Sequence, residues 1–392
     1  MHKQENHNQE YYRSCVVFII KSSFALSICI FILHIIAAVV IDPLQIFHRS
    51  FLFKDKLHNN MRVQAAGIIN NFDFDSIILG TSRMANTSGR EASQKIGGKF
   101  VNISVAGSSF FERHFILEYA LKKGIKNVIY SIDPYYVNKH IETRYPIRRW
   151  AFLYDNSCLN DLKIYLSKKV FFKIYKHGLL VGKVDVDRPN RWFFRQSTEF
   201  GLEKWLYRMN KTDFSSFCER LNKLASGAFL QQDAKPSLSV EQREGLVSLL
   251  HDNIIKYIKE YPDVNFFLVL TPMHRYYFAN NLFSNVVFFL MHQECIKYLV
   301  EQPFLNRNMF VFAFEDMDFL DDFENYRDTG HYHPKIDSFI LDCIAQRAHM
   351  LTPENVQRYL DIARMRAESF DFVTLNNRVK ELMATKSAQK HQ

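Results

Sequence analysis

Cysteine is scarce in this sequence and is never clustered. The six Cys among 392 residues are widely scattered, and no Cys-x-x-Cys pair or Cys/His spacing predicts a structural zinc site. We interpret them as isolated core thiols. The sequence also lacks a nucleic-acid-binding motif, an internal repeat and a low-complexity tract. It therefore predicts no metal, no cofactor and no nucleic-acid partner.

The charge balance favours a different kind of partner. The chain carries 50 Lys and Arg against 41 Asp and Glu, which gives a formal net charge of +9. In the absence of a nucleic-acid motif, this charge favours an anionic membrane or a cell-surface polymer. The composition, 47% hydrophobic and 23% charged, is that of a globular protein with little room for extended disorder.

One long apolar run lies near the N-terminus, from Cys15 to Ile41, interrupted only by Lys21 and His34. At about 1.5 Å per residue, a helix of this length crosses a hydrocarbon core of about 30 Å. The run is too long for a signal peptide, and Asp42-Pro43-Leu44 is a poor cleavage site. We expect an N-terminal tail at 1–14 and an uncleaved transmembrane anchor at 15–41, with a buried core helix as the alternative. Basic residues flank both ends, so charge does not fix the orientation.

Five short runs rich in Ile, Val and Phe predict strands that are buried on both faces of a parallel sheet. They cover Ser76–Leu79, Phe100–Val105, Asn127–Ile132, Asn265–Leu270 and Met309–Phe314. Helical patterns lie between them, at about 110–123, 240–261, 282–301 and 334–350. This alternation predicts an α/β fold, a three-layer sandwich around a mostly parallel five-stranded sheet.

An insertion interrupts the predicted α/β domain, which spans 71–350 after a connector at 42–70. About 130 residues separate the third and fourth predicted strands, far more than a crossover needs, so we place a helical insertion at about 139–235. The insertion is basic and carries all three tryptophans, Trp150, Trp192 and Trp205. Such a segment covers an active site, rests on anionic lipid, or forms a helical subdomain with a solvated basic face. A polar, helical tail is expected at 351–392.

The carboxyl ends of the predicted strands carry a serine, a glycine and an Asp/His pair. The first strand leads into Gly80-Thr81-Ser82, the second is followed by Gly107, and the last precedes Asp328 and His331. These ends share the edge of an open parallel sheet at which ligands bind. Ser82 is expected at a helix N-terminus, where free N–H groups stabilise an oxyanion, and a spacing of three lets Asp328 orient His331. Singly, Ser82 also reads as a helix N-cap and Gly107 as a turn glycine.

The order and spacing of these blocks resemble the SGNH hydrolase superfamily, whose first block is Gly-Asp-Ser-Leu or a variant and whose last is Asp-x-x-His. The match is closest to membrane-tethered envelope members, which D-alanylate lipoteichoic acid or acetylate alginate or peptidoglycan. The resemblance covers roughly 70–350 without the insertion and implies an SGNH/flavodoxin-like fold. It implies Ser82 as nucleophile, His331 as general base and Asp328 as its orienting carboxylate. The backbone N–H groups of Ser82 and Gly107 are the implied oxyanion donors.

Two positions depart from the pattern of the family. Thr81 replaces the Asp of the first block, as is common in envelope-type relatives. Asp133 stands where the third block, Gly-x-Asn-Asp, has an Asn that donates to the oxyanion, and an ionised carboxylate there would repel the oxyanion. If this carboxylate faces the oxyanion site, Asp133→Asn is expected to raise ester hydrolysis. If the carboxylate is bonded to its neighbours, Asp133 positions substrate or holds the strand turn.

Two histidines near the predicted site have open roles. His274 follows the fourth predicted strand and either lines the substrate pocket or is a structural histidine. His333, with His331 and Asp328, has the spacing of metal ligands on a strand, but a proline-led helix follows and no further ligand is clustered with them. We therefore expect no metal at this position.

The resemblance implies a serine O-acyltransferase or esterase that acts on acyl esters of a surface glycan or polymer. It also implies a single-pass protein of the inner or cytoplasmic membrane with an exported soluble domain. The partners implied are membrane lipid and a multi-span membrane acyltransferase. The alternative, which Asp133 favours, is a non-catalytic glycan-binding or assembly subunit of an envelope acylation system.

Overall fold

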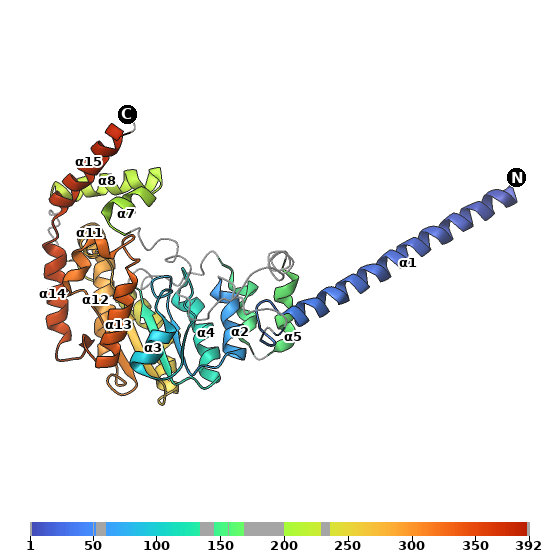
Figure 1. Cartoon of the computed structure of the whole chain (residues 1–392), viewed down its shortest axis with the longest axis horizontal. Coiled ribbons are helices and arrows are strands. Elements are labelled where there is room, and N and C mark those ends of the chain that lie inside the picture. Colours follow the sequence, from blue (N-terminus) through green and yellow to red (C-terminus); the bar gives the residue numbers. More distant parts are fainter. Residues whose placement is uncertain are drawn as a thin grey trace.

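The computed structural model describes residues 2–49, 51, 60–133, 145–155, 157–167, 200–228 and 236–389. The fold is α/β and mostly helical (Figure 1). Its strands are β1 (Ser76–Leu79), β2 (Phe100–Asn102), β3 (Asn127–Ile132), β4 (Asn265–Leu270), β5 (Met309–Phe312) and β6 (Met350–Leu351). The helices of the first half are α1 (His2–Ile41), α2 (Met61–Asn71), α3 (Gly89–Ile96), α4 (Phe110–Lys122) and α5 (Cys158–Asp161). Those of the second half are α7 (Leu202–Arg208), α8 (Lys211–Ala225), α9 (Val240–Leu250), α10 (Lys256–Glu260), α11 (Arg275–Ser284), α12 (Val286–Val300), α13 (Pro334–Gln346), α14 (Val356–Glu368) and α15 (Phe372–Gln389).

The sheet has six strands in the order β2-β1-β3-β4-β5-β6. Strands β1 to β5 pair in parallel, whereas β6 is antiparallel to β5. The prediction of five strands is therefore wrong, and the sheet is mixed. After α13, Arg347 and His349 take positive φ angles of 57° and 54°, and the chain turns back along β5. A strand of two residues carries no periodic signal that a sequence can reveal.

Side chains of the sheet feed two separate apolar clusters. Ile77 and Val128 belong to a cluster that includes residues of α2, α4, α9 and α12, whereas their neighbours Ile78 and Ile129 belong to one that includes residues of α3, α11 and α13. All four residues of β1 are buried. Burial on both faces explains why these strands read as continuous apolar runs without alternation.

The predicted insertion does not pack as one unit in the part that the structure describes. Trp150 is buried against Phe115 of α4. Trp205 of α7 instead packs against Phe323, which lies between β5 and α13. Helix α8 shares an apolar cluster with residues of α15, so the predicted tail is tied to the insertion. Trp192 and the rest of the segment 168–199 lie outside the described residues.

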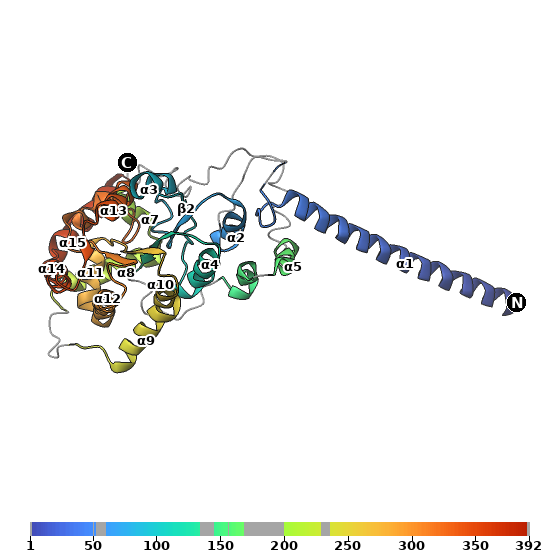
Figure 2. The ribbon, with the colours of Figure 1, turned by 90° about the horizontal axis from the view of Figure 1, so that it is seen from below.

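Helix α1 contains the predicted anchor and is long and apolar enough to cross a membrane. It projects away from the rest of the chain in both views (Figures 1 and 2). Phe18, Phe24 and Leu33 are 71%, 68% and 64% exposed. The alternative of a buried core helix is therefore wrong, because most apolar side chains of α1 are exposed and only its last turns, which include Ala38 and Ile41, pack against the domain.

Asp42 fixes the end of α1 to the domain. Its buried carboxylate accepts hydrogen bonds from the N–H groups of Ile46, Phe47 and His48, at 3.0, 2.7 and 2.9 Å, and from the hydroxyl of Tyr165. The three N–H bonds fold the connector into a tight turn directly after the helix. The fourth bond attaches that turn to the insertion.

Removal of residues 1–41 is expected to give a protein that purifies without detergent. The truncated chain keeps Asp42 and its turn, and no other described helix is long and apolar enough to span a bilayer. Sedimentation with membranes at high salt is the measurement. A truncated protein that still pellets fully would show that a second apolar attachment exists.

Candidate active site

Ser82 lies in a turn directly after β1. The predicted helix N-terminus is not there: Met84 N–H and Ala85 N–H donate to the carbonyls of Thr81 and Ser82 at 3.3 and 3.4 Å, and α3 begins only at Gly89. The N-cap of α3 is Ser88, which accepts from Glu91 N–H. The N-cap interpretation of Ser82 is therefore wrong, and the N-terminus of the following helix lies at Ser88.

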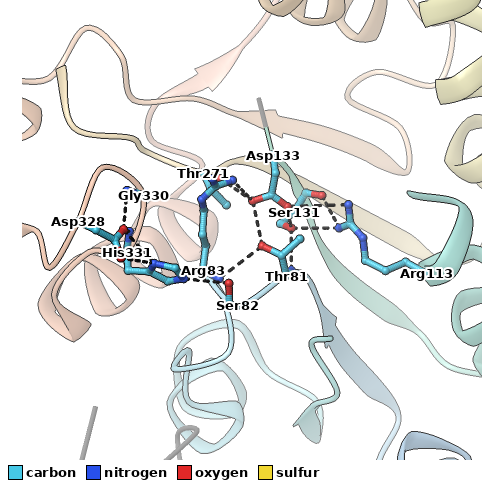
Figure 3. A network of polar contacts seen from close by, with 10 residues as sticks. All are labelled: Thr81, Ser82, Arg83, Arg113, Ser131, Asp133, Thr271, Asp328, Gly330 and His331. Atoms are coloured by element: carbon cyan, nitrogen blue, oxygen red, sulfur yellow. Dashed lines mark hydrogen bonds and ion pairs between the residues drawn. The ribbon is translucent and has the colours of Figure 1, made fainter. Parts of the chain in front are cut away.

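Ser82, His331 and Asp328 form a continuous hydrogen-bonded chain. The Ser82 Oγ lies 2.9 Å from His331 Nε2, and His331 Nδ1 lies 2.9 and 2.8 Å from the two carboxylate oxygens of Asp328 (Figure 3). With the Nδ1 proton directed at the carboxylate, Nε2 is free to accept the hydroxyl proton of Ser82. The contact expected between Ser82 and His331 is thus present, over a sequence separation of 249 residues.

The loop that carries His331 also holds the Asp328 carboxylate. Asp328 Oδ1 accepts from the N–H groups of Gly330 and His331, both at 2.9 Å. Burial acts to raise the pKa of Asp328, but the hydrogen bond and positive charge of His331 and the two N–H bonds outweigh it and lower the pKa to about 2. The carboxylate of Asp328 is therefore ionised at neutral pH.

The free energy of unfolding should fall in acid because of Asp328. Its folded pKa lies below the ordinary value of 3.8, so its contribution is complete above that pH and is lost as the pH falls towards 2. Denaturant titrations from pH 5 to pH 2 of the protein and of Asp328→Asn measure this. Between pH 5 and pH 2, the free energy of unfolding should fall less in Asp328→Asn than in the unaltered protein. Equal falls would contradict a lowered pKa of Asp328.

The backbone N–H groups of Ser82 and Gly107 are the oxyanion donors that the sequence predicts. No residue in the described part of the chain accepts the N–H of Ser82 or of Gly107. Gly107 is exposed, has a φ of +62°, and would have open space around an added Cβ. Its turn therefore needs glycine for the backbone conformation, as the turn interpretation held, and its N–H stays unoccupied.

Asp133 is the centre of a buried polar network and does not face solvent. Oδ1 accepts from Thr81 Oγ1, Arg83 Nη1 and Thr271 Oγ1 at 3.2, 2.8 and 2.9 Å, and Oδ2 accepts from Ser131 Oγ at 2.7 Å (Figure 3). The side chain is 0% exposed. This burial and these internal donors favour the alternative in which the Asp133 carboxylate is bonded to its neighbours and holds the strand turn.

Two arginines balance the charge of Asp133. Arg83 forms an ion pair with it at 2.8 Å, and fully buried Arg113 lies 3.8 Å away and donates to the carbonyl and hydroxyl of Ser131. Burial acts to raise the pKa of Asp133, but the charges of Arg83 and Arg113 and the Ser131 bond produce a net lowering. Sequence reasoning missed both arginines, because each pairs with a residue 20 or more positions away.

His274 and His333 cap helices and do not reach the triad. His274 is fully buried among aromatic rings, its Nδ1 accepts from Tyr276 N–H at 3.1 Å, and burial lowers its pKa to about 3. Its lack of exposed surface favours the structural interpretation of this histidine. His333 caps α13 through Lys335 N–H. Among the described residues, no group of three or more His, Cys, Asp or Glu is placed to hold a metal ion.

Comparisons of this chain with protein families, with curated proteins and with solved structures found no match. The function therefore has to be argued from the geometry of the site.

Asp133→Asn is expected to destabilise the protein, because it leaves Arg83 and Arg113 without their buried counter-charge. Breaking a buried ion pair typically costs about 3–5 kcal/mol of unfolding free energy, which chemical denaturation can measure. Asp73→Asn is the matched control, since Asp73 pairs with Lys99 on the surface, and should leave stability nearly unchanged. Equal losses in the two variants would remove the central role given to Asp133.

Proposed function

We propose that this chain is a membrane-anchored serine O-acyltransferase or esterase with an SGNH-type three-layer fold. The proposal depends on one observation: Ser82 Oγ lies 2.9 Å from His331 Nε2, and His331 Nδ1 lies 2.8 Å from Asp328 Oδ2. A strand-end serine within reach of a base that a carboxylate orients is the arrangement used for nucleophilic acyl transfer.

Each residue of the contact has a defined role in the reaction. Ser82 Oγ bonds to the acyl carbonyl carbon while His331 Nε2 takes the hydroxyl proton, and the carbonyl oxygen becomes an oxyanion held by the N–H groups of Ser82 and Gly107. His331 then returns the proton to the departing alcohol, which leaves an acyl-enzyme. Water completes an esterase cycle and a glycan hydroxyl completes a transferase cycle, with His331 again as base. Asp328 keeps the imidazole oriented and stabilises its charged form.

The network around Asp133 weakens one argument for the alternative, a non-catalytic glycan-binding or assembly subunit. That alternative depended on a carboxylate that repels an oxyanion. Because two arginines and three hydroxyl groups bind the carboxylate of Asp133, its negative charge is compensated inside the protein. The oxyanion would then depend on backbone donors alone, without the side-chain amide of the family pattern.

The proposed site of action is the cell envelope. Helix α1 is suited to anchor the chain in the inner or cytoplasmic membrane, with the α/β domain exported. The net charge of +9 favours an anionic surface polymer or glycan as the acyl acceptor or donor. A multi-span membrane acyltransferase is the proposed source of acyl groups, and membrane lipid is the proposed contact of the basic insertion.

A fluorophosphonate probe should label Ser82, because only an activated serine reacts with it. The full-length protein in detergent should also hydrolyse p-nitrophenyl acetate. Ser82→Ala should abolish labelling, and both Ser82→Ala and His331→Ala should lower kcat by at least about 10³-fold, since members of such a unit fail together.

The same experiment separates the competing functions. A folded protein that takes up no probe would favour the non-catalytic subunit. A protein that takes up the probe and releases the acyl group faster when a glycan is added than in water alone would be a transferase.

A further inference from the structure

The loop after β2 turns two consecutive carbonyl groups towards one guanidinium. Arg62 Nη1 donates to the carbonyl of Ala106 at 3.0 Å, and Arg62 Nη2 donates to the carbonyl of Gly107 at 3.2 Å. Arg62 lies in the first turn of α2, a helix that carries none of the residues of the triad. The contact therefore joins a separate element to the loop that bears a proposed oxyanion donor.

Glu112 fixes the guanidinium of Arg62 in place. The two side chains form a two-pronged ion pair, with Nε to Oε1 at 2.7 Å and Nη2 to Oε2 at 3.0 Å, and their side chains are 3% and 0% exposed. Glu112 is itself held, because Oε2 also accepts from Ser109 N–H in the capping box of α4. Planar, two-pronged pairs of this kind restrict orientation as well as position.

The direction of the Gly107 N–H follows from the trans peptide. In a trans peptide the C=O of one residue and the N–H of the next point in opposite directions. Because Arg62 holds the carbonyl of Ala106, the Gly107 N–H points away from Arg62. That N–H has no acceptor among the described residues, and hydrogen bonding at the carbonyl of the same peptide strengthens it as a donor.

The loop begins beside the turn that carries Ser82. Val105 N–H donates to the carbonyl of Gly80 at 2.7 Å, and Gly80 N–H donates to Ser104 Oγ at 3.0 Å. Strand β2 pairs directly with β1, so the two strand-end loops start at the same edge of the sheet. The loop that bears the Gly107 N–H therefore starts next to the turn that bears Ser82.

We propose that Arg62, held by Glu112, is a positioning residue that keeps the Gly107 N–H aimed at the oxyanion formed on Ser82 attack. This inference rests on the proposed acyl transfer and adds a second group of residues to it. It also gives a reason why the proposed site could work without a side-chain amide: one of the two backbone donors, the Gly107 N–H, is held by a buried ion pair.

Arg62→Lys in the full-length protein in detergent tests the inference. An ammonium group keeps the charge but cannot bind two carbonyls and a carboxylate in one plane. The substrate is p-nitrophenyl acetate, and each rate is expressed per fluorophosphonate-labelled site. We expect kcat to fall about 10- to 100-fold, which does not exceed the usual loss for one oxyanion donor. KM should change less than about threefold, and the pH midpoint of kcat should not move, because His331 and Asp328 are untouched. Glu112→Gln, which keeps an acceptor for Ser109 N–H, should give a smaller fall.

Asn308→Ala is the matched control for lost backbone support. Asn308 lies just before β5, at the amino end of that strand and so opposite to the carboxyl edge that bears Ser82. Its buried side chain donates to the carbonyls of Ile258, Tyr261 and Val264. This variant should lose thermal stability without a change in kcat per labelled site. If it lowers kcat as much as Arg62→Lys does, the effect is general loosening and the inference is overturned.

A double-mutant cycle with Gly107→Ala gives the decisive outcome. An added Cβ at Gly107 meets no atom within 4 Å, so this change acts through the strain of its positive φ. If Arg62 acts through Gly107, the double variant should be no slower than the slower single variant. The inference is overturned if the fold-losses in kcat of the two single variants multiply in the double variant, if kcat is unchanged in Arg62→Lys, or if the pH midpoint shifts. In each of these cases, labelling of Ser82 would still uphold the proposed function. Absence of labelling in the unaltered protein would overturn both.

Discussion

The carboxylate of Asp133 is the interaction on which the rest of the site depends. It binds Thr81 after β1, Ser131 at the end of β3 and Thr271 after β4, so one buried charge joins the carboxyl ends of three neighbouring strands. A buried charge is tolerated only when it is paired and hydrogen-bonded, and here Arg83 and Arg113 supply the pairing. Arg83 directly follows Ser82, so the network that compensates the charge also holds the turn of the nucleophile.

The guanidinium of Arg83 also connects the turn of Ser82 to the loop of His331. A Cβ added at Gly330 would lie 2.8 Å from Arg83 Nε, so the backbone of the base loop packs directly on Arg83. Further backbone bonds close that loop: Arg327 N–H donates to the carbonyl of His331 at 2.8 Å, and His274 N–H donates to that of Thr329 at 2.9 Å. His274 thus supports the loop through its main chain while its ring stays in the core.

The sequence predicted those parts of the site that local patterns encode. Strands β1, β3 and β4 match the expected bounds because uninterrupted apolar runs are typical of strands buried on both faces. The order of Ser82, Asp328 and His331 indicated their convergence, because parallel strands bring their carboxyl ends together. These signals need no knowledge of distant contacts.

Other parts depend on tertiary contacts and leave no such pattern. Arg113 lies in the helix sequence FFERHF, where a charged residue is ordinarily assigned to the solvent face, yet it is fully buried. The sequence indicated that the Asp133 carboxylate would repel an oxyanion, because it does not reveal the arginines and hydroxyl groups that bind this carboxylate. The helix expected at Ser82 is absent because the chain makes hydrogen-bonded turns as far as Ser88.

The end of the membrane-suited helix and the oxyanion loop share one helix as their support. The carbonyl of Leu44 accepts from Gln64 Nε2 at 2.8 Å, and a Cβ added at Gly67 would lie 2.0 Å from that same carbonyl, so the connector after α1 packs directly against the backbone of α2. One turn earlier in α2, Arg62 binds the carbonyls of Ala106 and Gly107. Close packing transmits displacement, so a shift of this connector against α2 is expected to reach Gly107 through Arg62. The connector that follows α1 and the loop of Gly107 are therefore joined through α2.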